Sequence, residues 1–108
     1  MSSTPRFLYL NVRGKRVGCV AVSVDREHAV VHYRTSVKHP KDEFSKEKAR
    51  VIAAGRLASE PETVRVHADA NSYEISSAVM LHLSRKSDAP ARARKAAEEW
   101  LAANPEHT

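Results

Sequence analysis

Three runs rich in β-branched and aromatic residues follow one another near the N-terminus, and the links between them are very short. The runs are RFLYLNV (6–12), RVGCVAVSV (16–24) and HAVVHYRTSV (28–37). Residues of these types favour extended strands. The first link places Gly14 where a tight hairpin requires positive φ, and the second, DRE (25–27), is polar and equally short. Links of this length permit only antiparallel pairing, so the sequence predicts an antiparallel meander.

The alternation of side chains assigns the faces of the predicted strands. In the third run, every second residue belongs to a mainly apolar set, and the residues between them are more polar. The mainly apolar set forms one face of the strand and should point inward. Its members are Ala29, Val31, Tyr33, Thr35 and Val37. The middle run is apolar at nearly every position, which is typical of a central strand. Its two sets of side chains are Val20, Val22 and Val24 on one side and Val17, Cys19 and Ala21 on the other. Either both faces of this strand are covered or one is a contact surface.

The stretch FSKEKARVIAAGRLASEP (44–61) carries the first helical pattern. Pro40 interrupts the strand pattern before it and Asp42 suits an N-cap, so we expect a helix over residues 43–58 that Pro61 ends. At about 100° per residue, one side of this helix should face the sheet. That side is formed by Phe44, Val51, Ile52 and Gly55. The opposite side is formed by Lys46, Arg50 and Leu57.

The second half of the chain adds one strand and two helices. TVRVHA (63–68) alternates like a fourth strand. Helical patterns follow over 73–86, with Ser72 as cap, and over 89–104, with Ser87 or Asp88 as cap. The apolar seam of the last helix is Ala93, Ala96, Ala97, Trp100 and Leu101. The predicted fold class is α+β: a single domain over residues 1–108, in which an antiparallel sheet of three to four strands, meander first, packs against two to three α-helices in the order βββαβαα.

The sequence lacks the patterns that direct a protein to export or into a membrane. The N-terminal residues show no signal-peptide pattern, and no run approaches the ~18 apolar residues that span a bilayer. We therefore expect a cytoplasmic protein without membrane contact. Cys19 is the only cysteine, so no intrachain disulfide can form, which fits a reducing compartment.

Few residues suit catalysis or metal binding. The three glycines are too scattered for a loop that cradles phosphates, and Cys19 lies in an apolar strand without a positioned base. His28 and His32 are four residues apart, which on a strand rising ~3.3 Å per residue separates them by about 13 Å, too far to share one ion. We expect no cofactor, no metal site and no catalytic residues, and we interpret the protein as a non-enzyme.

Positive charge is concentrated in the first half of the chain. Residues 1–60 hold 12 lysines and arginines against 6 acidic residues, whereas residues 61–108 hold 6 against 7. The predicted partner-binding residues are Arg13, Lys15 and Arg16 at the first hairpin tip, Lys38 and Lys41 at the helix entrance, and Lys46, Arg50 and Arg56 on the helix. If the tip and the helix meet, one patch would attract phosphates or an acidic protein. The alternative is an ordinary solvated face.

Aromatic residues that could stack on bases are few. Those in the predicted sheet are Phe7, Tyr9 and Tyr33. The sequence shows neither a helix-turn-helix pattern nor a recognisable RNA-binding sheet motif. Nucleic-acid binding therefore rests on the basic residues alone.

The segments FLYLNVRGKRVGCVAV and DEFSKEKARVIAAGRL together resemble small accessory proteins encoded by bacteriophages and prophages of Gram-negative bacteria, over residues 6–58. The resemblance implies no catalytic residues. It implies a protein that binds a host or phage component, because many such proteins inhibit host defence machinery, including CRISPR effector complexes, by occupying a groove.

Two function hypotheses follow. The first is a non-catalytic protein that inhibits or regulates a host complex, either protein or nucleoprotein, through the basic hairpin tip and the first helix. The second is a small DNA- or RNA-binding regulator that uses the same residues on phosphates. A homodimer through the last helix and Trp100 is a further expectation, with core packing of that helix as its alternative.

Overall fold

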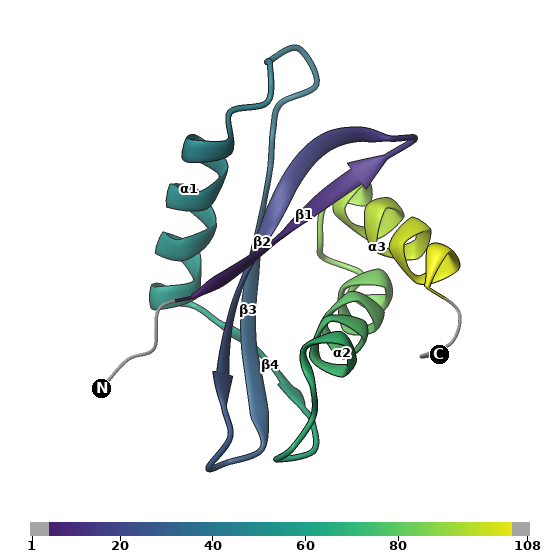
Figure 1. Ribbon diagram of the computed structural model, residues 1–108. Helices are drawn as coiled ribbons and strands as arrows, with labels where there is room; N and C mark the ends of the chain where they lie inside the picture. The colour runs from purple at the N-terminus through teal and green to yellow at the C-terminus, as the bar shows by residue number, and fades with distance from the viewer. Residues whose placement is uncertain (1–4, 105–108) are drawn as a thin grey trace.

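The computed structural model of the protein describes residues 5–104 (Figure 1). Its elements are β1 (Arg6–Val12), β2 (Lys15–Asp25), β3 (Val30–Val37), α1 (Lys46–Ser59), β4 (Glu62–Arg65), α2 (Ser72–Arg85) and α3 (Ala91–Ala103). The strands form one antiparallel sheet in the order β1-β2-β3-β4. The predicted α+β class and the order βββαβαα are confirmed. Within the described residues, none of the three helices combines the length and the apolar character needed to cross a membrane.

The sheet is the middle of three layers. Helix α1 covers one face over β2 and β3, and α2 and α3 cover the other face (Figure 1). The main core lies on the α2–α3 side and contains Val20, Val31, Tyr33, Ile75 and Val79 among its fully buried members. A smaller core of Cys19, Ala21, Ala49 and Ala53 lies under α1. Both faces of the central strand are therefore covered, which explains why β2 is apolar at nearly every position.

The first hairpin turns at Arg13 and Gly14, which have φ of 54° and 79°. Two central residues with positive φ match the right-handed twist of the flanking strands, so the predicted turn at Gly14 is confirmed. The second hairpin differs from the prediction. β2 continues through Asp25, the turn includes Ala29 with φ of 56°, and β3 begins at Val30 rather than at His28.

Strand β2 contains one extra residue, Val17, next to the first hairpin. Leu10 lies opposite Gly18, whereas the next residue, Asn11, lies opposite Arg16. This arrangement is a β-bulge, and it reverses the side to which the residues near the hairpin point. Val17 therefore packs in the main core, and the prediction that placed it on the other face of the strand is wrong.

Helix α1 begins three residues later than predicted. Its N-cap is Ser45, whose hydroxyl accepts the backbone N–H of the third helical residue (3.3 Å), and the first helical residue is Lys46. The predicted cap, Asp42, instead belongs to a turn in which its N–H donates to the His39 carbonyl (3.0 Å). The helix therefore starts only after this turn, at the cap that Ser45 provides.

The inward side of α1 also differs from the prediction. Val51 and Ile52 are 67% and 46% exposed, while Ala49 and Ala53 are buried against the sheet. The expectation that Val51, Ile52 and Gly55 face inward is wrong. Leu57, expected on the far side, is partly buried against the smaller core, and Phe44 packs there as predicted although it precedes the helix.

Ala49 and Ala53 face the sheet in place of Val51 and Ile52 because the residues beneath α1 are small. Cys19, Ala21 and Ser36 form the sheet surface there, and all three are buried. The Ser36 hydroxyl donates to the Ala49 carbonyl (2.8 Å), so the helix backbone lies within hydrogen-bonding distance of a strand side chain. Only alanines fit into this contact, because protein interiors leave few voids and tolerate little overpacking. The larger aliphatic side chains are therefore turned to the solvent.

The second half of the chain follows the prediction with small shifts. β4 spans Glu62–Arg65 rather than 63–68. α2 is capped by Asn71 rather than Ser72, in a capping box with Glu74. α3 begins after Pro90 without a side-chain cap, so neither Ser87 nor Asp88 caps it.

The apolar seam of α3 is confirmed. Ala93, Ala96 and Ala97 are buried, and Trp100 and Leu101 pack against the main core. The Trp100 ring also contacts the Tyr73 ring of α2 (centroids 5.8 Å apart). The seam is therefore covered by the chain's own β1 and α2. Of the two expectations for the last helix, a homodimer contact or packing in its own core, the structure shows the packing.

Candidate interaction surface

Three of the predicted binding residues meet around one tyrosine. The guanidinium of Arg16 lies 4.4 Å from the centre of the Tyr9 ring, the Lys46 ammonium lies 5.3 Å from it, and the guanidinium of Arg50 lies 5.8 Å from it. Arg50 also lies 5.3 Å from the Phe7 ring centre. We call these five residues the cation–aromatic cluster. Each contact places a cation near the negative face of an aromatic ring, which is worth about 0.5–1 kcal/mol at an exposed site.

Three elements bring the cluster together. Phe7 and Tyr9 alternate on β1 and point to the face of the sheet that carries α1, but α1 lies over β2 and β3 and leaves β1 beside it. Lys46 and Arg50 are four residues apart and therefore share the flank of α1 that faces β1. The strand neighbour of Asn11 is Arg16 because of the bulge at Val17, and this register turns Arg16 toward Tyr9.

One hydrogen bond and one ring contact fix the orientation of the cluster. The Nε–H of Arg50 donates to the Tyr9 hydroxyl oxygen (2.6 Å), and the Tyr9 ring meets the Phe44 ring edge-on (centroids 6.3 Å apart). Within residues 5–104, no carboxylate lies within 4.0 Å of Arg16, Lys46 or Arg50, since the ion pairs there involve other residues. The cluster thus holds three cations whose charge the described chain does not neutralise, so its surface favours an anionic partner.

An apolar ridge runs along the solvent side of α1. It consists of Val51, Ile52, Gly55 and Ala58, all of them exposed. Val51 and Ile52 are two of the three large apolar residues that are exposed in residues 5–104, the third being Leu81. No neighbouring atom lies within 4 Å of the position that a Gly55 Cβ would take. An exposed apolar strip bordered by cations is typical of a surface that meets another macromolecule.

Two other predicted residues lie on the opposite flank of α1. Lys38 and Lys41 line a hollow beside Ile52, together with Lys48 and Phe44. The Lys38 ammonium donates to the Asp42 carbonyl (2.8 Å), so it holds its own loop. Lys41 and Lys48 are exposed. The ridge of α1 is therefore bordered by basic residues on both sides.

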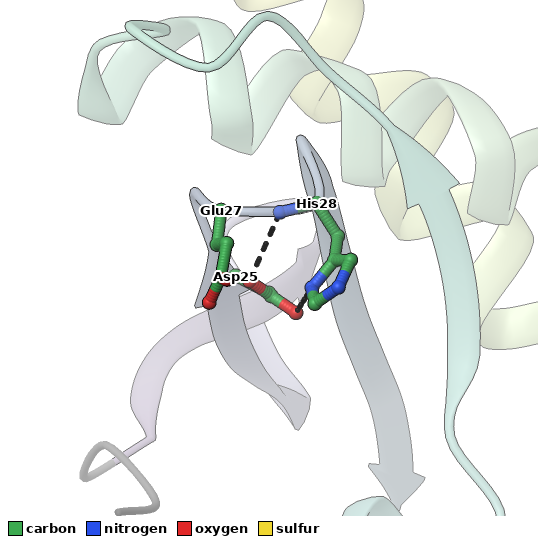
Figure 2. A group of neighbouring side chains, drawn as sticks. All are labelled: Asp25, Glu27 and His28. Atoms are coloured by element: carbon green, nitrogen blue, oxygen red, sulfur yellow. Dashed lines mark hydrogen bonds and ion pairs between the residues drawn. The ribbon is translucent and has the colours of Figure 1, made fainter.

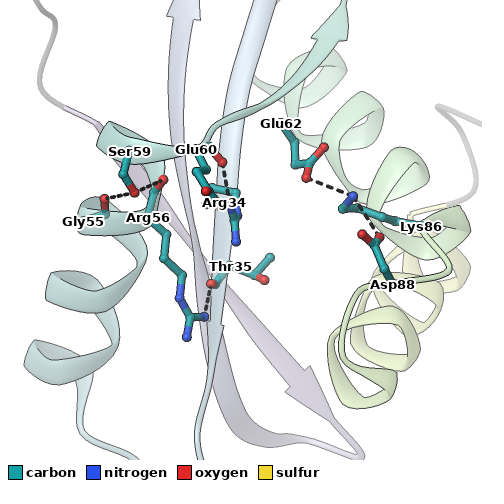
Figure 3. Close-up of polar contacts among 9 residues, drawn as sticks. All are labelled: Arg34, Thr35, Gly55, Arg56, Ser59, Glu60, Glu62, Lys86 and Asp88. Carbon is teal, nitrogen blue, oxygen red and sulfur yellow. Dashed lines mark hydrogen bonds and ion pairs between the residues drawn. The ribbon is translucent and has the colours of Figure 1, made fainter.

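The remaining predicted residues do not join the cluster. Arg13 and Lys15 lie at the hairpin tip beside α3, where the Arg13 N–H donates to the Glu99 carboxylate (2.9 Å). The Arg56 guanidinium donates to the Thr35 carbonyl of β3 (2.8 Å; Figure 3), which ties the end of α1 to the sheet. Of the basic residues at the hairpin tip, only Arg16 therefore lies beside the basic residues of α1, as the sequence predicted for all three.

Tyr33 is not available as a stacking platform. Its side chain is 1% exposed in the main core, and its hydroxyl shares a hydrogen bond with His82 Nδ1 (2.7 Å). Burial, followed by the nearby Glu62 carboxylate, raises the pKa of Tyr33 from 10.0 to about 12. The aromatic rings of the candidate surface are those of Phe7 and Tyr9.

Cys19 is fully buried beneath α1. Burial raises the pKa of its thiol, which disfavours the nucleophilic thiolate. Its Sγ lies 3.7 Å from the Ser36 hydroxyl. This thiol is part of the packing under α1.

A group of possible metal ligands lies in the β2–β3 turn. The ligand atoms of Asp25, Glu27 and His28 lie within 4.8 Å of one another (Figure 2). The Asp25 carboxylate accepts hydrogen bonds from the backbone N–H of His28 (3.2 Å) and lies 2.7 Å from its ring Nδ1. These hydrogen bonds lower the pKa of Asp25. Closing the turn explains the arrangement without an ion.

The chain was compared with known proteins at the levels of family, sequence and structure. No protein-family model, no curated protein and no solved structure matches it. The geometry of the described residues therefore carries the functional argument.

Proposed function

We propose that the protein is a non-catalytic binding protein that inhibits or regulates a host complex by docking α1 and the cation–aromatic cluster onto an acidic surface of that complex. The observation that carries the proposal is the position of three cations that lack carboxylate partners in residues 5–104, beside a solvent-facing apolar ridge on α1. Lys46 and Arg50 belong to α1 and Arg16 to the adjoining β2. The resemblance of residues 6–58 to phage accessory proteins supports the same class, with a defence complex as the type of target.

The physical properties of the surface suit a protein interface. Such interfaces have an apolar centre and a polar rim, and arginine and aromatic residues are enriched among the side chains that dominate binding. Complete burial of a valine or isoleucine side chain contributes about 1.5–3 kcal/mol, so the half-exposed Val51 and Ile52 offer part of that amount each. The contact of Arg16 and Arg50 with aromatic rings restricts their motion before binding, which reduces the entropy lost on docking.

A charge reversal tests the proposal. Arg50→Glu should weaken capture of the host complex about tenfold or more, because a hot-spot arginine would be replaced by a repelled carboxylate. The matched control is Lys95→Glu, which makes the same charge change on an exposed position of α3. Capture from a bacterial lysate by the immobilised variants, quantified by mass spectrometry, measures the effect, and circular dichroism checks the fold.

Two outcomes would contradict the proposal. Equal capture by Arg50→Glu and the wild-type protein would assign the cluster to the ordinary solvated surface. If Lys95→Glu reduced capture as much as Arg50→Glu does, capture would depend on the net charge of the protein and not on the cluster. Partial recovery with Arg50→Lys, and a loss with Val51→Ser, would support the combined basic and apolar surface.

Direct binding of single-stranded nucleic acid is the second candidate function. Phe7 and Tyr9 lie beside the three cations on one face of the sheet, and aromatic rings among basic residues favour single strands. Contacts to three phosphates of a single strand should lower affinity about 20-fold between about 50 and 200 mM salt. Fluorescence anisotropy with random single-stranded and duplex DNA measures this slope. Absence of binding at low salt would leave the acidic protein surface as the function.

A further inference from the structure

The outer edge of β4 lacks a strand partner. β4 pairs with β3 alone, and the Val66 N–H donates to the Ala29 carbonyl (3.0 Å), so this amide faces β3. Because backbone groups alternate in direction along an antiparallel strand, Thr63 and Arg65 direct their N–H and C=O groups outward. Within residues 5–104, no hydrogen bond satisfies these outward groups. An unpaired edge of this kind is a template for an added strand.

A groove runs beside this edge, between β4 and α2. It is an open groove with a volume of about 620 Å³, and its apolar lining comes from Val64, Ala78 and Leu81. Leu81 is 39% exposed and is one of the large apolar side chains on the surface of residues 5–104. Peptides that add a strand to a sheet edge place alternate side chains in such an adjoining apolar pocket.

The charges around the groove are not balanced. Lys86 lies between the carboxylates of Glu62 and Asp88, at 2.9 Å from each, and is neutralised (Figure 3). Arg65 on β4 and Arg85 at the end of α2 line the same groove, and no carboxylate of residues 5–104 lies within 4.0 Å of either. Arg85 therefore adds an uncompensated guanidinium group to the α2 wall of the groove. Arg65 adds a second at the strand edge, where its side chain alternates with that of Val64 and so points to the other face of the sheet.

We propose that this groove binds an extended acidic peptide of a partner protein, which adds as a fifth strand to β4. The peptide backbone pairs with the outward groups of Thr63 and Arg65, an apolar side chain enters the pocket at Leu81, and carboxylates meet Arg65 and Arg85. Nucleic acid has no backbone that continues a sheet, and the groove lining contains no phenylalanine, tyrosine or tryptophan. A second copy of the chain carries the same net charge of +5, which opposes its approach.

This site is separate from the cation–aromatic cluster. The groove lies toward α2, whereas the cluster lies on the face that carries α1. Variants of one site therefore leave the residues of the other unchanged, and the two proposals succeed or fail independently.

The direct test uses Thr63→Pro and Thr63→Val. Both remove the hydroxyl that shares a hydrogen bond with His32 Nδ1 (3.0 Å), but only proline also removes the outward N–H. The probe is a short fluorescent peptide that alternates glutamate with leucine or valine, and anisotropy measures its affinity. Thr63→Pro should weaken binding about tenfold relative to Thr63→Val, because a carbonyl of the added strand loses its donor. Arg65→Glu should also weaken binding about tenfold.

Control peptides separate strand addition from other binding. A version with lysine in place of glutamate, and a version with N-methyl groups on alternate backbone nitrogens, should both bind poorly. Equal affinity for the N-methylated peptide, or for Thr63→Pro and Thr63→Val, overturns the proposal, as does absence of binding up to about 1 mM protein. Dimerisation of the free protein in ultracentrifugation that Thr63→Pro abolishes would assign the edge to a second copy instead.

Discussion

Gly18→Ala is expected to lower the free energy of unfolding by about 3 kcal/mol or more. A Cβ at this position would lie 2.1 Å from the Ser36 carbonyl oxygen and 3.0 Å from the Val37 Cα. Both atoms belong to the backbone of β3, so the clash cannot be relieved by turning a side chain. The neighbouring bulge at Val17 adds to the constraint, because it fixes how β2 approaches β1.

The matched control is the same substitution on the surface of α1. Gly55→Ala adds a methyl group where no atom lies within 4 Å, and it replaces a residue that weakens helices. It should raise the free energy of unfolding by about 0.5–1 kcal/mol. Urea unfolding followed by circular dichroism measures both variants. Similar free energies for the two would contradict the close contact between β2 and β3 at Gly18.

Raising the pH from 10 to 12 is expected to destabilise the protein by about 2 kcal/mol through Tyr33 alone. Burial, with the Glu62 carboxylate as a lesser cause, raises the pKa of Tyr33 from 10.0 to about 12. Below pH 10 the phenol is neutral in the folded and unfolded states, so its contribution to stability is complete. Between pH 10 and 12 the unfolded chain loses this proton while the folded chain keeps it. The free energy of unfolding therefore falls as the pH rises through this window.

Tyr33→Phe isolates the effect. The variant loses the hydrogen bond to His82 Nδ1 at every pH, which lowers its stability by about 1 kcal/mol below pH 10. It has no phenol to ionise, so its stability should fall less between pH 10 and 12. All other ionisable groups are identical in the two proteins, so their effects cancel in the difference. Denaturant unfolding at the two pH values gives this difference, and parallel pH profiles would show that Tyr33 ionises as easily in the folded protein as in the unfolded chain.

The two proposed surfaces suit a protein that holds two partners at once. The cation–aromatic cluster and the ridge of α1 lie on one side of the sheet, and the groove beside β4 opens on the side of α2. The three large apolar residues exposed in residues 5–104 belong to these surfaces, Val51 and Ile52 to the first and Leu81 to the second. A single complex that presents an acidic surface and an acidic extended segment would use both.

Local signals in the sequence determined the order of the elements. The meander follows from links too short for a crossover and from Gly14, whose positive φ suits the hairpin turn. The apolar seam of α3 was equally readable, because its alanines recur with the helical period. These features depend on residues that are close together in the chain, so they can be predicted from the sequence.

The candidate surface was only partly readable. Lys46 and Arg50 share a flank of any helix that contains both, so their proximity followed from spacing alone. Arg16 joined them only because of the bulge at Val17, and no signal in the sequence marked that extra residue. The alternating residues of β4 predicted a strand. That the strand lies at the edge of the sheet, with a groove beside it, depends on the order in which the strands pair.

The direction in which α1 faces was decided by tertiary packing. Hydrophobicity favours Val51 and Ile52 inside, whereas the structure buries Ala49 and Ala53. The sheet under the helix is lined by small residues and by the Ser36 hydroxyl, which donates a hydrogen bond to the helix backbone. The space between helix and sheet is therefore too small for the valine and isoleucine side chains. The amino-acid sequence thus determined which elements form and in what order, because those depend on local spacing. The register of the strands and the face of the helix were decided by the fit between elements, which exists only in the folded chain.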